Sequence, residues 1–94
     1  MPLFMVIETF RPGRVAEMYQ RFRERGRMAP PGVQYLNSWV DLRHERCFQV
    51  MQAESREALA GWTKNWEDLV EFDVVPVRTS SEAAEAFARG PDRE

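Results

Sequence analysis

Two residue types that carry much of protein chemistry, cysteine and histidine, are almost absent from this chain. Its 94 residues include one cysteine, Cys47, and one histidine, His44. A single cysteine cannot form an internal disulfide, and this fits a reducing cytoplasm. One histidine and one cysteine do not provide the ligand spacing of a zinc site, and His44 stands among charged residues in an expected turn, where a haem ligand would not lie. The sequence therefore predicts no metal and no cofactor.

Strong net charge and long apolar runs are also missing. The net charge is −2 at pH 7, which creates no general attraction for nucleic acid or for an acidic membrane. No segment approaches the roughly 20 apolar residues that cross a bilayer. The N-terminal residues lack the basic leader of a signal peptide. We therefore expect a cytoplasmic protein that does not insert into a membrane.

The periodicity of apolar residues predicts a single domain over residues 1–90. Strands are expected at residues 3–10, 33–42, 46–53 and 72–77. Three helices are expected: one that ends at Gly26, one that Ser55 caps and that continues to Leu69, and one that follows a capping box of Thr79 and Glu82. Residues 91–94 are expected to form a disordered tail.

This order of elements predicts an α+β fold of the ferredoxin-like type, a four-stranded antiparallel sheet with two helices on one face and a further C-terminal helix. Pro76 lacks an amide donor, so that part of the last strand should lie at an edge or in a bulge. The face without helices should be strongly apolar, because we assign to it Phe4, Val6, Tyr35, Trp39 and Met51. A patch of this kind predicts a homodimer in which two sheets face each other. Whether the last helix packs on its own subunit or on the second one stays open.

Polar residues interrupt the strands on this same expected face. If the alternation is regular, the face carries Glu8, Tyr35, Asn37, Trp39, Asp41, Gln49 and Met51. An apolar lining with a few polar groups is typical of a small-molecule pocket. A carboxyl group such as Glu8, partly desolvated, would have a raised pKa and could act as a proton acceptor. Asn37 and Gln49 would orient a carbonyl or phenol of the ligand.

Charge is unevenly distributed along the chain. Residues 11–27 hold six arginines and two glutamates, a net charge of +4, and residues 54–73 have a net charge of −4. Mutual attraction of the two segments is the simpler interpretation, since neighbouring helices would carry them. RNA binding by the arginines is the alternative. Against it, the third strand lacks the basic-glycine-aromatic signature of an RNA-recognition motif, and an acidic lining would repel phosphate.

Several segments of the chain are distinctive: M-V-I-E-T-F, R-F-R-E-R-G-R-M, Y-L-N-S-W-V, R-C-F-Q-V-M and W-E-D-L-V-E-F-D-V-V-P-V-R-T-S-S-E-A. Together, over about residues 3–88, they resemble a bacterial family of unknown function, the one numbered 3303 among such domains. The resemblance implies a dimeric α/β barrel. The wider superfamily includes antibiotic-biosynthesis-type monooxygenases, muconolactone isomerase-like proteins and stress-responsive barrel proteins. The resemblance supplies no catalytic residue.

Two functions remain from this reasoning. In the first, a homodimer binds a small apolar or aromatic molecule between its sheets and could act as a cofactor-independent isomerase or monooxygenase-like enzyme through Glu8. In the second, the protein is a structural or regulatory dimer whose polar groups satisfy one another, without catalysis. Cys47 has no histidine placed to activate it as a nucleophile. Trp62 and Trp66 follow a helical stripe and should pack against the sheet.

Overall fold

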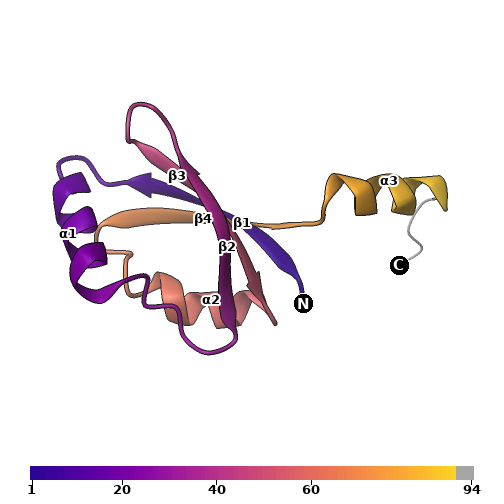
Figure 1. The fold of residues 1–94 in the computed structure, drawn as a ribbon, viewed down its shortest axis with the longest axis horizontal. Coiled ribbons are helices and arrows are strands. Elements are labelled where there is room, and N and C mark those ends of the chain that lie inside the picture. Colours follow the sequence, from indigo (N-terminus) through magenta and orange to yellow (C-terminus); the bar gives the residue numbers. More distant parts are fainter. Residues whose placement is uncertain (91–94) are drawn as a thin grey trace.

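A computed structural model describes residues 1–90 of the chain, and the expected tail, residues 91–94, lies outside them. The elements follow in the order β1 (Leu3–Phe10), α1 (Val15–Arg25), β2 (Val33–Val40), β3 (Arg46–Ala53), α2 (Arg56–Thr63), β4 (Val70–Val77) and α3 (Ser80–Ala88) (Figure 1). The strands form one open antiparallel sheet in the order β2-β3-β1-β4. The predicted class, a small α+β protein, is confirmed. Within residues 1–90, no helix combines the length and the apolar character that a membrane crossing requires.

The hydrophobic core lies between the sheet and α2. Phe4, Val6 and Met51 are buried there together with Leu59 and Trp62. The prediction that these three strand residues lie on the open face is therefore wrong, because they lie on the face that the helices cover. Both faces of β1 are apolar, and alternation alone does not say which of two apolar faces receives the helices.

The face without helices is apolar as well. The pairing of the strands places on it partly exposed side chains of β1, β3 and β4, namely Leu3, Met5, Ile7, Phe48, Val50, Val75 and Val77. The prediction of an apolar open face thus holds, and Trp39 lies there as predicted, but the other residues of that face differ from those predicted.

A β-bulge divides β2 into two halves. Tyr35 pairs with Met51, but Asn37 already pairs with Val50, so that Leu36 is an extra residue without a partner in β3. Side chains after the bulge consequently change sides relative to regular alternation. Ser38 and Val40 turn toward the helices, whereas Asn37 and Trp39 turn toward the open face.

The ends of two elements differ from their predictions. Ser55 caps α2 as predicted, since its Oγ accepts a hydrogen bond from the amide of Ala58 at 3.2 Å. The helix ends at Thr63, however, and hydrogen-bonded turns carry the chain to β4. Trp66 and Leu69 are still buried there, so their helical spacing reflects burial rather than a continuous helix. β4 starts earlier than predicted, at Val70, and pairs only with β1, which confirms the edge position expected from Pro76.

The last helix stands away from the rest of the molecule. The predicted capping box of α3 is present, with the Thr79 hydroxyl accepting from the Glu82 amide and the Glu82 carboxylate accepting from the Thr79 amide. Figure 1 shows α3 projecting beyond the end of β4, and the molecule extends 47 Å along its longest axis. Phe87 of this helix is 88% exposed.

The basic and acidic segments contact each other. Arg21 of α1 forms a bidentate ion pair with Asp68, with N–O distances of 2.8 and 2.7 Å. Arg11 pairs with Glu71 at 3.2 Å. These contacts fit the interpretation that the two segments attract each other, and they hold α1 against the connection between α2 and β4.

Candidate functional site

A pocket lies between α1 and the covered face of the sheet. Its volume is about 240 Å³. The strands provide its polar side chains, Glu8, Ser38, Cys47 and Gln49. The remaining walls are mostly apolar and aromatic: Phe10, Met18, Tyr19, Phe22, Arg27, Val40, Trp62 and Trp66. Met18, Tyr19 and Phe22 form the α1 side of this pocket.

The strand register brings the polar side chains together. Glu8 of β1 pairs with Cys47 of β3, and Gln49 pairs on its other side with Ser38 of β2. Side chains opposite each other on neighbouring strands lie on the same face. Three strands therefore contribute to one polar patch within an apolar surface.

Glu8 is buried and incompletely bonded. The residue is 9% exposed, and within residues 1–90 its Oε2 atom has no hydrogen-bond partner. Burial raises the pKa of this carboxyl to about 7, and the positive charge of Arg27 opposes that shift. The carboxyl is therefore close to half-ionised at neutral pH, which suits a group that accepts and returns protons.

Gln49 and Cys47, which lie next to Glu8, form only weak hydrogen bonds. The amide nitrogen of Gln49 donates to the Met51 sulfur at 3.1 Å, and its oxygen accepts from the Cys47 sulfur at 4.0 Å. Sulfur is a poor hydrogen-bonding atom, so the Gln49 amide can exchange these contacts for better ones to a ligand. Burial and the charge of Glu8 raise the pKa of the Cys47 thiol to about 12, and this agrees with the prediction that Cys47 is not a nucleophile.

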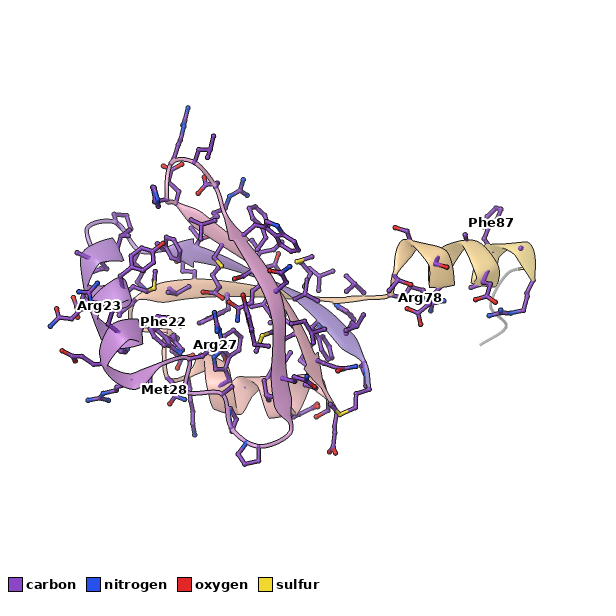
Figure 2. All side chains as sticks on the ribbon, viewed as in Figure 1. Phe22, Arg23, Arg27, Met28, Arg78 and Phe87 are labelled. Carbon is purple, nitrogen blue, oxygen red and sulfur yellow. The ribbon has the colours of Figure 1, made fainter. Side chains whose placement is uncertain are left out.

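Arg27 brings a cation to the pocket from the segment that follows α1. Its guanidinium carbon lies 3.6 Å from the centre of the Tyr35 ring. The same carbon lies 5.1 Å from the centre of the Phe22 ring, and Figure 2 labels Arg27 and Phe22. Its carbonyl oxygen accepts hydrogen bonds from the indole N–H groups of Trp62 at 3.1 Å and Trp66 at 2.9 Å. The two tryptophans pack in the core as predicted, and they also fix the backbone from which Arg27 extends.

Four of the residues predicted to line one cavity lie on the covered side of the sheet. Glu8 and Gln49 both line the pocket. Met51 is fully buried in the core next to Gln49. The ring of Tyr35 packs against the guanidinium of Arg27. The Tyr35 hydroxyl shares a hydrogen bond with the Ser38 hydroxyl at 2.8 Å.

Asn37, Trp39 and Asp41 do not belong to this site, and placing them beside Glu8 was wrong. The bulge at Leu36 turns Asn37 and Trp39 to the opposite face, where Trp39 is 56% exposed. Asp41 lies in the turn between β2 and β3. His44 lies exposed in the same turn, as predicted.

No sequence pattern indicated Arg27, Ser38 or the aromatic side chains of α1 as parts of a site. Ser38 would have been found if the bulge had been recognised, but no glycine or other signal marks it. Arg27 stands outside any periodic element, directly after Gly26. Within residues 1–90, no three side chains of the histidine, cysteine, aspartate and glutamate types come close enough to hold a metal ion.

The fold and the pocket define a small α+β protein with a buried carboxyl group beside a mostly apolar cavity. The model of the family described as "Domain of unknown function (DUF3303)" matches residues 2–91, so the chain belongs to this family. Comparison with curated proteins gave no match, and comparison with solved structures gave none either.

Proposed function

We propose that this protein binds a small, mostly apolar molecule in the pocket beneath α1 and that Glu8 exchanges a proton with it. One observation carries the proposal: the Oε2 atom of the buried Glu8 has no partner among the described residues, although the carboxyl lines a cavity. Buried polar atoms are nearly always bonded. A ligand atom in the cavity would provide the partner that the chain does not.

The chemistry that this arrangement supports best is a cofactor-independent isomerisation. Glu8 would take a proton from one atom of the ligand and return it to another, so that no proton is gained or lost overall. Gln49 would orient a carbonyl oxygen of the ligand through its amide N–H. Asn37, which we expected to share that role, has no part in it, because it lies on the other face. A monooxygenase-like reaction is the alternative activity of the same pocket, and it would use molecular oxygen as a co-reactant.

The molecular setting that we propose is a cytoplasmic homodimer joined through the open sheet face. The apolar side chains of β1, β3 and β4 on that face support it, since a patch of this kind usually has a partner. The β-α-β-β-α-β order supports a ferredoxin-like arrangement and, with the resemblance noted above, a bacterial member of the dimeric α/β-barrel superfamily. The competing proposal is a structural or regulatory dimer without catalysis, and the open volume of about 240 Å³ weighs against it.

Native mass spectrometry of freshly purified protein tests the binding proposal. We expect a retained small mass that is lost on denaturation. Val40, which lines the pocket and is 38% exposed, offers a way to block it by Val40→Trp. Leu42→Trp is the matched control, because Leu42 is 98% exposed in the turn and does not line the pocket.

Loss of the retained mass in Val40→Trp but not in Leu42→Trp would place the ligand in this pocket. Retention in both variants would place it elsewhere. If no mass is retained, a fragment library is screened by the indole N–H signals of Trp62 and Trp66. The binding proposal is abandoned if no fragment shifts those signals in the unmodified protein.

A further inference from the structure

We infer that the ligand of this pocket is a small, flat organic acid, whose carboxylate pairs with Arg27 while its apolar body lies among the aromatic side chains. The inference rests on the proposed function and names the chemical class of its ligand. It depends on the donors of Arg27, on the way the backbone holds this residue, and on the size and walls of the cavity.

Within residues 1–90, the N–H donors of the Arg27 side chain have no hydrogen-bond partner. The ion pairs found within residues 1–90 involve Arg11, Arg14, Arg21 and Arg89, and no hydrogen bond from the Arg27 side chain to another described residue is present. The guanidinium carbon lies over the Tyr35 ring at 3.6 Å and over the Phe22 ring at 5.1 Å, and the N–H donors of any guanidinium lie along the edge of its plane. A carboxylate can accept two parallel hydrogen bonds from that edge.

Contacts within the chain fix the position of Arg27. The two indole hydrogen bonds hold its carbonyl oxygen, and Tyr35 stacks on its guanidinium. Little conformational freedom is then left to lose on binding, so that the cation is preorganised for an anion. An exposed arginine such as Arg23, which Figure 2 shows on the outer side of α1, has no such support.

The size and composition of the cavity restrict the rest of the ligand. A volume of about 240 Å³ lies below the roughly 300–1,000 Å³ of sites for drug-sized molecules, so that a single-ring compound is the appropriate size. Aromatic and sulfur-containing side chains form most of the walls. Such walls favour a flat apolar body, because rings stack or meet edge to face.

Glu8 adds a dependence on pH. The other ionisable side chains that line the pocket are Arg27, Cys47 and Tyr19. When Glu8 is protonated, it can donate a hydrogen bond to the ligand, and when it is ionised, it repels the carboxylate. With a pKa of about 7 for Glu8, the affinity for the acid should fall about tenfold between pH 6 and pH 8.

Two pairs of probes test the inference: benzoate with benzamide, and salicylate with salicylamide. Each amide matches the shape of its acid but lacks the carboxylate. Binding is measured by titration at pH 6 and pH 8, from the indole N–H signals of Trp62 and Trp66. The variants are Arg27→Met, which keeps an apolar stem, and Arg23→Met, which removes the same charge from the outer side of α1.

We expect the unmodified protein to bind the acids more tightly than the amides at pH 6. Arg27→Met should weaken acid binding about tenfold or more and leave amide binding nearly unchanged, whereas Arg23→Met should alter neither. Equal affinity for acids and amides, unchanged by Arg27→Met, would overturn the acid class but leave a small-molecule pocket. If none of the four probes binds, the proposal of a single-ring organic acid is overturned. The fragment screen then decides separately whether the pocket binds any small molecule.

Discussion

Glu8 makes the stability of the whole fold depend on pH. Its pKa is about 7 in the folded protein, against an ordinary value of 4.5. Between these values the folded chain holds a proton that the unfolded chain has released, so the free energy of unfolding falls as the pH rises from 4.5 to 7. Asp68 acts in the opposite sense, because its hydrogen bonds to Arg21 lower its pKa.

Glu8→Gln should remove this fall, because a glutamine keeps the shape of the side chain but does not ionise. Relative to the unmodified protein, the variant should gain about 3 kcal/mol of unfolding free energy as the pH rises from 4.5 to above 7. Urea unfolding at a series of pH values measures it. Glu54→Gln serves as the control, since Glu54 is exposed and does not line the pocket. Parallel curves for Glu8→Gln and the unmodified protein would contradict the raised pKa.

At the scale of elements, the hairpin of β2 and β3 depends on one turn residue. The Asp41 carboxylate accepts hydrogen bonds from the amides of Glu45 at 2.7 Å and Arg46 at 2.9 Å. These bonds, that of Arg46 most of all, lower the pKa of Asp41. His44 has a positive φ of 57° in the same turn, a conformation that a fixed turn must maintain against its steric cost. Asp41 therefore has a structural role, in place of the ligand-binding role that its position in the sequence suggested.

Asp41→Ala should lower the melting temperature more than Asp41→Asn, because the amide oxygen of asparagine can still accept the two backbone hydrogen bonds. The exchange of the Glu45 and Arg46 amide protons should be faster in Asp41→Ala. Thermal unfolding and hydrogen exchange measured by NMR check both effects. Arg43→Ala, an exposed change in the same turn, is the reference. An equal melting temperature for Asp41→Ala and Arg43→Ala would show that the carboxylate does not hold the turn.

The strand and helix pattern was predictable because each element follows a simple periodicity. Glu8 and Gln49 were correctly placed on one face, since β1 and β3 are regular strands. The residues of β2 were placed wrongly, since the bulge at Leu36 breaks the alternation without a mark in the sequence. The covered face was also assigned wrongly, because β1 is apolar on both sides. Arg27 reaches the pocket through tertiary contacts, which no local pattern encodes.

At the scale of the whole molecule, two apolar surfaces have no partner within the described part of the chain. One is the open sheet face, and the other is the exposed side chain of Phe87 on α3, which Figure 2 labels. Figure 1 shows that α3 extends away from the sheet, so that the two surfaces of one chain do not cover each other. The dimer that we propose would bury the sheet face.

Val50→Lys should convert the dimer into a monomer at micromolar concentration, because Val50 pairs with Met5 on the open face and a buried lysine charge there would be unpaired. Sedimentation equilibrium measures the change in mass. Gln20→Lys adds the same charge to an exposed position of α1 and should leave the mass of the dimer unchanged. A monomeric unmodified protein at this concentration would refute the dimer before any variant is made.

The extra residue in β2 makes its own deletion nearly silent at the pocket. Tyr35 pairs with Met51 and Asn37 with Val50, so without Leu36 these two pairs would follow each other as in a regular strand. Ser38 would still lie opposite Gln49, and Val40 opposite Cys47, with both side chains facing the cavity. A single codon deletion would thus straighten β2 and leave the lining of the binding site as it is.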